Sequence, residues 1–253
     1  MQARIQAELL RLEREHHVRI LYACESGSRA WGFPSPDSDY DVRFIYVHPP
    51  AWYLTLDEGA DTLNFPVDDE LDLAGWELRK TLKLLRGSNA ALLEWLQSPI
   101  TYHEAPGFRA AVQPLLAAGF NPLAGLHHYL GLVRRGVEED LSAAEVRLKR
   151  LFYALRSALA ARWIRERHSL PPMELTPLRA MLPAALQAEV DALLRRKATA
   201  DEKTTVPRPA ALADFLATEY AAGQQARATL AAPRRLDPTP ELTALFRQLV
   251  GAS

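Results

Sequence analysis

The chain has 253 residues, 48% of them apolar and 24% charged, and these proportions exclude a mainly disordered protein. Its single cysteine excludes both an internal disulfide framework and a zinc site built from cysteines of one chain. The net charge of −1 is unevenly spread, because residues 1–126 carry −6 and residues 127–253 carry +5. A basic half is typical of a surface that meets a polyanion, and equally of solvated helix faces.

Residues 1–105 show the patterns of a small α/β unit. The apolar runs 18–25 and 40–48 are of strand length, and each ends at turn residues or prolines. Amphipathic spacing indicates helices on either side of them. The predicted elements are a helix over 3–15, strands over 18–25 and 40–48, short strands around 53–56 and 61–65, a strand over 70–75, and helices over 76–86 and 90–97.

From about residue 106 the strand signal disappears and helical patterns follow one another, most of them bounded by proline or a capping residue. The polar stretch 197–208 is expected to be a loop. We therefore predict an α+β protein, with a mixed sheet and its helices over residues 1–105 and a helical bundle over 106–253. The predicted helices of the second part are 107–118, 122–136, 142–167, 183–196, 208–230 and 239–249.

The first part contains an ordered series of polar residues. Gly27-Ser28 is followed after ten residues by Asp39-Tyr40-Asp41, and an isolated Asp72 comes later between two leucines. Alternation along a strand puts Asp39, Asp41 and Arg43 on one face, opposite Val42 and Phe44. Neighbouring carboxylates repel each other, and a divalent cation removes that repulsion. Glycine before a helix start lets the backbone approach a phosphate.

The segments GSRAWGFPSPDSDYDV, DLAGWELRKTLKLLRGSNAALLEWLQSPI and KRLFYALRSALAARWI carry a family resemblance. The first resembles the DNA polymerase β-like nucleotidyltransferase superfamily. Together they are most similar to the RlaP type, the RNA ligase-associated, polymerase-like proteins linked to RNA repair.

The resemblance implies a role for each motif residue. Asp39 and Asp41 would bind two Mg²⁺ or Mn²⁺ ions, and Asp72 would be the third metal ligand and the base toward the acceptor hydroxyl. Gly27 and Ser28 would hold the β- and γ-phosphates of an NTP.

Several further residues are candidates for the same site. Arg29 could neutralise triphosphate charge. Lys149, Tyr153 and Arg156 lie on one face of a predicted helix and suit a nucleotide, with a ring for the base and cations for phosphates. Arg43 is either a substrate ligand or a structural partner of Asp39 or Asp41. The cluster Arg195–Lys197 is expected to be a solvated helix end.

These observations predict a metal-dependent nucleotidyltransferase acting on an RNA end, together with an RNA ligase or other RNA-repair proteins. Two alternatives stay open: nucleotidylation of a protein or a small molecule such as an antibiotic, and a non-catalytic nucleotide-sensing or RNA-binding module. No apolar run approaches the ~20 residues that span a bilayer, and the charged N-terminus lacks the apolar core of a signal peptide. We therefore expect a cytoplasmic protein without a membrane partner.

Overall fold

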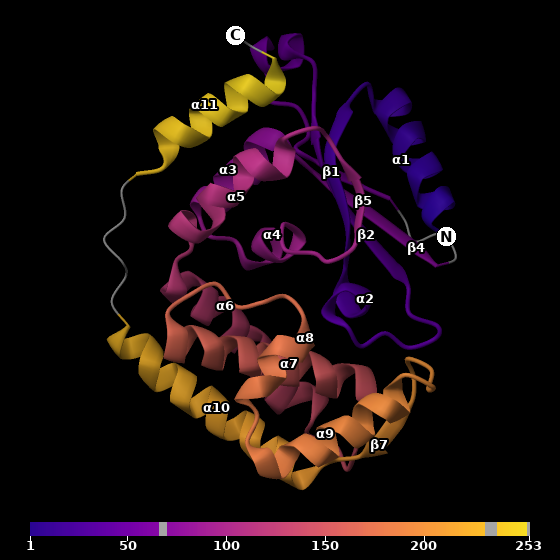
Figure 1. Ribbon diagram of the computed structural model, residues 1–253, viewed down its shortest axis with the longest axis vertical. Coiled ribbons are helices and arrows are strands. Elements are labelled where there is room, and N and C mark those ends of the chain that lie inside the picture. The colour runs from indigo at the N-terminus through magenta and orange to yellow at the C-terminus, as the bar shows by residue number, and fades with distance from the viewer. Residues whose placement is uncertain (66–69, 231–236, 252–253) are drawn as a thin grey trace. The chain divides into compact units, whose positions relative to one another are not determined.

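The computed structural model describes residues 1–65, 70–230 and 237–251 (Figure 1). The chain forms two compact units. The sheet unit comprises residues 1–27, 39–119 and 235–253, and the helical unit comprises residues 28–38 and 120–234. These units differ from the expected division after residue 105. The C-terminal helix α11 (Thr239–Val250) packs on α3 (Leu78–Arg86) in the sheet unit, whereas the segment that follows Gly27 belongs to the helical unit.

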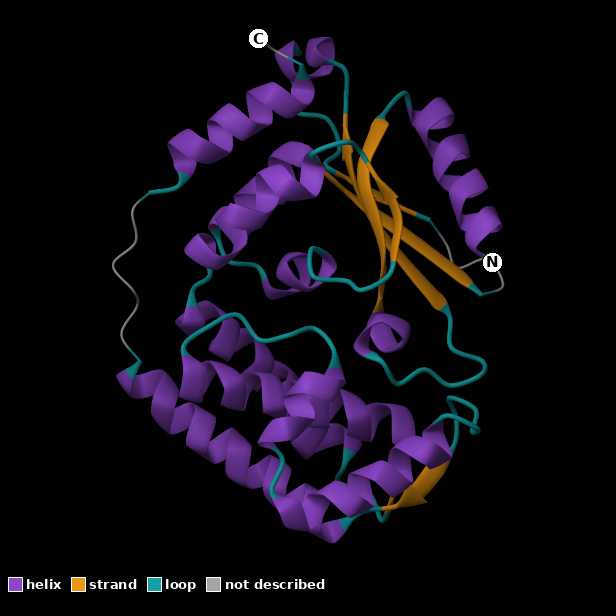
Figure 2. Ribbon diagram, in the orientation of Figure 1, coloured by secondary structure: helices purple, strands orange, loops and turns teal. Residues whose placement is uncertain are grey.

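The sheet unit is built on five strands in the order β3-β4-β2-β1-β5 (Figure 2). β2 and β4 run parallel, and the other neighbours are antiparallel, so the predicted mixed sheet is confirmed. The strands are β1 (Arg19–Ser26), β2 (Tyr40–Val47), β3 (Thr62–Asn64), β4 (Leu71–Glu77) and β5 (Thr101–Glu104).

Helices cover both faces of this sheet. On one face α1 (Gln2–His16) buries Ile5, Leu9 and Leu12 in an apolar cluster with residues of β1, β2 and β4. Figure 1 shows α3 and α4 (Ala90–Trp95) on the opposite side of the sheet from α1. The helix α5 (Phe108–Gly119) also belongs to this unit, and Phe108 stacks on Tyr22 of β1.

Two expectations for the sheet unit are wrong. A short strand was expected around 53–56, but residues Pro50–Leu54 form a 3₁₀ helix, because Pro50 lacks an N–H for a strand ladder and suits a first helical turn. A helix was expected from residue 76, but β4 continues to Glu77. The Glu77 carboxylate accepts a hydrogen bond from the Lys80 N–H at 3.1 Å, so Glu77 caps α3, which starts one residue later.

The helical unit is organised around α7 (Leu148–Arg167), which packs against α6 (Pro122–Arg135) and α10 (Ala210–Thr229). Ala154, Ala158 and Ala161 are buried on α7, and small side chains let neighbouring helices approach closely. The unit also contains a π-helical turn (Gly136–Asp140), α8 (Leu175–Leu178), a 3₁₀ turn (Arg179–Met181), α9 (Ala184–Lys197) and, from Ser28 onward, α2 (Gly27–Trp31).

A small two-stranded antiparallel sheet in the helical unit contradicts two expectations. Strand β6 (Glu145–Arg147) pairs with β7 (Thr205–Pro207), where we expected the start of a helix and a loop. Val146 and Val206 lie opposite each other and are buried, which holds the pair together. The helix expected from 142 therefore begins at Leu148.

Candidate functional site

Asp41 and Asp72 lie side by side on neighbouring parallel strands. The register of β2 and β4 pairs Asp41 directly with Asp72. Val42 and Phe44 point into the cluster beneath α1, so the strand alternation puts Asp41 on the opposite face of the sheet, as predicted. The side chains of Asp41 and Asp72 are 28% and 30% exposed, so solvent reaches both carboxylates.

The guanidinium of Arg43 joins these two carboxylates. Its Nη2 lies 3.1 Å from Asp41 Oδ1 and 2.8 Å from Asp72 Oδ2. Its Nη1 also donates to the backbone carbonyls of Asp72 at 3.1 Å and of Val42 at 3.2 Å. A cation thus occupies the place between the two acidic groups and offsets their repulsion. The sequence left two roles open for Arg43, a substrate ligand or a structural partner of Asp39 or Asp41. The structure supports the second role, with Asp41 as a partner, and adds Asp72 as another.

Gly27 directly follows the last residue of β1 and lies next to Asp41. Its φ of +66° lies in the region that favours glycine, and a Cβ at this position would collide with the Asp41 carboxylate. The neighbouring Ser26 pairs with Asp41 in the sheet. Glycine is therefore required here by the close approach of the backbone to an acidic side chain.

Glu25 holds the backbone of Asp41 through a hydrogen bond, a role that the sequence did not indicate. Its side chain is fully buried, and one carboxylate oxygen accepts a hydrogen bond from the Asp41 N–H at 2.8 Å. The other oxygen accepts a hydrogen bond from the Tyr102 hydroxyl of β5. The only sequence signal is an acidic residue at the end of the apolar run LYACE.

The donor set of this region fits a divalent metal, although the third carboxylate is not assembled with the other two. Asp39 precedes β2 and is exposed. In the described part of the chain, no three Asp, Glu, His or Cys side chains form a group ready to hold a metal ion. Asp41 and Asp72 nevertheless present partly exposed carboxylates on either side of the Arg43 guanidinium. Carboxylate oxygens are the ligands that Mg²⁺ prefers.

Ser28 and Arg29 close a loop within the helical unit. Ser28 is buried, and its hydroxyl donates to Ser38 Oγ at 3.2 Å. The Arg29 guanidinium donates to the Ser38 carbonyl through Nη2 at 2.6 Å and Nε at 3.2 Å. Ser28 and Arg29, both predicted to bind phosphate, thus lie at the start of the segment 28–38 and bind Ser38 at its other end.

The predicted stripe Lys149, Tyr153 and Arg156 lies on one side of α7 and packs against aromatic residues of the same loop. The Tyr153 ring meets the Trp31 ring edge-on at 4.9 Å between centroids. Arg156 is 2% exposed, its Cζ lies 4.4 Å from the centre of the Trp31 ring, and its Nε donates to the Met173 carbonyl at 2.8 Å. These contacts hold Trp31 on α7.

Two residues of the α9 region anchor the loop 28–38: Lys197 at the end of α9 and Glu202 in the turn after it. The sequence indicated neither role. Glu202 accepts from Ser38 Oγ at 2.8 Å and pairs with Lys149 Nζ at 2.5 Å, and its N–H donates to Asp37 Oδ1 at 3.0 Å. Lys197 is not a solvated helix end. It is 1% exposed, donates to Ser35 Oγ at 2.8 Å, and burial lowers the pKa of its ammonium group.

A mixed sheet with a Gly-Ser turn and aspartates on adjacent strands is the arrangement expected of a polymerase β-like nucleotidyltransferase. The chain matches the family model described as RlaP, RNA repair pathway DNA polymerase beta family, over residues 1–248. It is also 44% identical to the uncharacterized protein YcgL of Bacillus subtilis (strain 168) over 252 residues, which cover 99% of this chain and 96% of that protein. The chain therefore belongs to the RlaP family, which confirms the resemblance seen in its motifs.

Across the residues that the structure describes, no helix combines the length and apolar composition that crossing a bilayer requires.

Proposed function

We propose that the protein transfers a nucleoside monophosphate from an NTP to a hydroxyl group of RNA and releases pyrophosphate. The observation that carries this proposal is the pairing of Asp41 with Asp72 around one cation on the exposed end of two parallel strands. In the reaction, the acceptor oxygen forms a bond to the α-phosphorus, the bond to the bridging oxygen breaks, and pyrophosphate leaves.

Asp39, Asp41 and Asp72 are the residues that would hold two Mg²⁺ or Mn²⁺ ions. Bound ions would supply charge stabilisation for the attacking and leaving oxygens. Asp72 would take the proton of the acceptor hydroxyl. Arg43 contacts both Asp41 and Asp72, so it offsets the repulsion between their carboxylates until metal ions take its place.

The loop 28–38 and α7 would position the NTP. Gly27 brings the backbone close to Asp41, and Ser28 and Arg29 follow it directly. Lys149 and Tyr153 pack beside this loop, whereas Arg156 is buried. We therefore assign the nucleotide contacts to the side chains of Arg29, Lys149 and Tyr153 and to the backbone at Gly27 and Ser28. The side chains of Ser28 and Arg156 are both buried, and Arg156 has a part in holding Trp31.

The choice of RNA as acceptor follows the family description and the charge of +5 on residues 127–253. An RNA ligase or other cytoplasmic RNA-repair proteins are the protein partners that we propose. A non-catalytic nucleotide-binding module is the second candidate, and one observation favours it: Arg43 already neutralises the two carboxylates that metals would need.

Pyrophosphate release tests the proposal directly. The protein is incubated with each of the four NTPs and Mg²⁺ or Mn²⁺, with and without a pool of short RNAs. RNA-dependent release that disappears in Asp39→Ala/Asp41→Ala and persists in the exposed control Asp57→Asn supports the proposal. Release without RNA would move the acceptor to a protein or small molecule, and NTP binding without any release would establish the non-catalytic module.

A further inference from the structure

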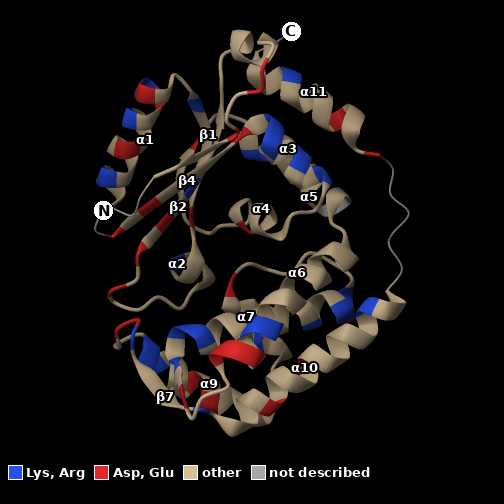
Figure 3. Cartoon of the chain, turned by 180° about the vertical axis from the view of Figure 1, so that it is seen from behind, with Lys and Arg blue, Asp and Glu red and all other residues tan. Residues whose placement is uncertain are grey.

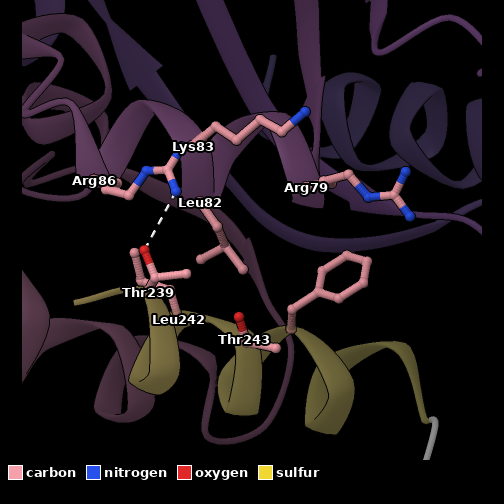
Figure 4. Close-up of a pocket in the computed structure, with 8 residues that line it drawn as sticks. Arg79, Leu82, Lys83, Arg86, Thr239, Leu242 and Thr243 are labelled. Atoms are coloured by element: carbon pink, nitrogen blue, oxygen red, sulfur yellow. Dashed lines mark hydrogen bonds between the residues drawn. The ribbon is translucent and has the colours of Figure 1, made fainter. Parts of the chain in front are cut away.

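A groove separates α3 from α11 within the sheet unit (Figure 4). Figure 4 shows Leu82 pointing from α3 toward α11, where Leu242 and Thr243 face it. The groove has a volume of about 230 Å³. That is below the roughly 300–1,000 Å³ of pockets that enclose a whole small molecule, so the groove suits one unit of a longer ligand.

The α3 side of this groove is basic. Arg79, Lys83 and Arg86 line it at successive steps of four and three residues, which places them on one helix face. Figure 3 shows Lys and Arg residues along α3. Among the described residues that line the groove, none carries a carboxylate. Asp237 is close enough to Arg86 to be affected by its charge: the pKa of Asp237 is lowered by hydrogen bonds from Thr239 and, more weakly, by Arg86.

The three cations differ in how they are held. Arg86 Nη1 donates to Thr239 Oγ1 at 3.3 Å across the groove. Lys83 is exposed on the rim. Their helix positions spread the three charges over about 10 Å of the helix axis, further than one phosphate group reaches. A polyanion with several phosphates matches this row better than a single anion does.

One end of the groove carries aromatic rings. The Arg79 Cζ lies 5.4 Å from the Phe246 ring centre and 5.0 Å from that of Tyr53, and the two rings meet edge-on at 5.1 Å. Phe246 is only partly buried. A row of cations that ends at a partly exposed ring is the combination by which proteins bind single-stranded nucleic acid, with phosphates on the cations and a base on the ring.

We propose that this groove binds a single-stranded segment of the RNA acceptor. The inference deepens the proposed function and rests on it for the identity of the polyanion. Lys83 and Arg86 contact successive phosphates, and the Phe246 edge of the groove meets a base. The groove is distinct from the aspartate site, because none of its lining residues belongs to β2 or β4.

Fluorescence anisotropy with a labelled single-stranded RNA, measured over a salt series without NTP, tests this inference. The key variant is Lys83→Gln/Arg86→Gln, and the matched control is Arg4→Gln/Arg14→Gln, which removes the same charge from α1. Each lost phosphate contact lowers the salt slope by about 0.7 and the affinity by roughly fivefold at 0.1 M salt, so we expect about 25-fold weaker binding for the pair. The control, and Lys83→Arg, are expected to bind as the wild type does.

Several outcomes would overturn the inference. These are equal RNA binding by the groove variant and the wild type, an equal loss in the α1 control, and binding of free NTP that depends on the same two residues while RNA binding does not. Capture of an acidic protein with no RNA binding would assign the groove to a protein partner instead. Melting curves of every variant establish that the fold is retained.

Kinetics separate this inference from the proposed function. If both hold, the groove variant raises the KM for RNA and leaves kcat unchanged, whereas Asp41→Asn lowers kcat and leaves RNA binding unchanged. RNA-dependent pyrophosphate release with normal KM in the groove variant would refute the groove alone. Weakened RNA binding by the groove variant, with no pyrophosphate release from the wild type, would refute the proposed function alone.

Discussion

The strand pair that carries Asp41 and Asp72 and the loop of residues 28–38 hold their charged groups in opposite ways. On the strands, one guanidinium faces two carboxylates that stay 28% and 30% exposed. Around the loop, Lys197 and Arg156 are buried and donate to Ser35 and Met173. Partly exposed ion pairs contribute little stability, whereas buried and hydrogen-bonded cations are costly to remove. We therefore place the proposed metal chemistry on the strands, whereas Lys197 and Arg156 support the loop that would position the NTP.

The largest effect is expected at Asp72. Asp72→Asn keeps the side chain's shape but removes a metal-binding charge and the proposed base, so nucleotidyl transfer falls by about 10³-fold or more. The free energy of unfolding changes by less than about 1 kcal/mol, because the ion pair with Arg43 is partly exposed. Turnover assays and urea denaturation measure the two effects. A large loss of stability with normal turnover would reverse the assignment of the strand site.

Arg156 is expected to matter for stability. Arg156→Met removes the hydrogen bond to the Met173 carbonyl and the stacking on Trp31, at a cost of about 2–3 kcal/mol in the free energy of unfolding. Arg156→Lys does not restore it, because an ammonium group lacks the planar guanidinium. The matched control on the same helix is the exposed Arg150→Met, expected within about 0.5 kcal/mol of wild type. Urea denaturation that finds Arg156→Met equally harmless would contradict the structural role.

Gly27 tests the close approach at the strand site. Gly27→Ala places a Cβ against the Asp41 carboxylate in a backbone region unfavourable for alanine, so we expect a loss of about 1–2 kcal/mol and weaker Mn²⁺ binding. Gly131→Ala, in the middle of α6 with open space around its Cα, is the control and is expected to be neutral or slightly stabilising. Thermal melting and Mn²⁺ titration check both. Unchanged melting and metal binding in Gly27→Ala would remove the steric argument.

Under the proposed function, Arg43 competes with metal ions for the carboxylates of Asp41 and Asp72. Arg43→Gln removes the resident cation, and we expect Mn²⁺ to bind about tenfold more tightly, as repulsion between Asp41 and Asp72 favours a new counter-ion. Electron paramagnetic resonance of free Mn²⁺ gives the affinity without reference to activity. Arg14→Gln is the control for the lost charge. Weaker Mn²⁺ binding in Arg43→Gln would instead make Arg43 an organiser on which the metal site depends.

The smallest effect concerns Lys197 and pH. Because burial lowers its pKa below 10.5 in the folded protein, the unfolded chain binds more protons between the two pKa values. The free energy of unfolding therefore rises with pH across that window, and Lys197→Met should flatten the rise. The exposed Lys203→Met should leave it unchanged. Identical pH profiles for wild type and Lys197→Met would show that Lys197 does not carry this dependence.

Local patterns in the sequence predicted much of the sheet unit. The alternation of β2 separates Asp41 and Arg43 from Val42 and Phe44, and both faces are as predicted. The position of Asp72 opposite Asp41 could not be derived in the same way, because a parallel pair is joined by a long crossover that leaves its register open. The family motif supplied that residue.

Non-local contacts account for what the sequence did not reveal. Strands β6 and β7 are three residues long and lie far apart in the chain, so neither shows an alternation by itself. Glu202 and Lys197 sit in polar sequence that predicts solvent exposure. Only tertiary contacts with residues 35–38 bury Lys197 and partly cover Glu202. Glu25 was missed for the same reason, because its partners are Tyr102 and the Asp41 backbone.

We propose that the protein transfers a nucleotide to RNA at the site formed by Asp41 and Asp72. The most direct test follows label from an NTP carrying radioactive α-phosphate into RNA, with wild-type protein, Asp41→Asn and Asp57→Asn in parallel. We expect labelled RNA with wild type and Asp57→Asn and none with Asp41→Asn, while all three melt alike. Equal labelling by Asp41→Asn and wild type, or no labelling of RNA with any NTP and either metal, would contradict the claim.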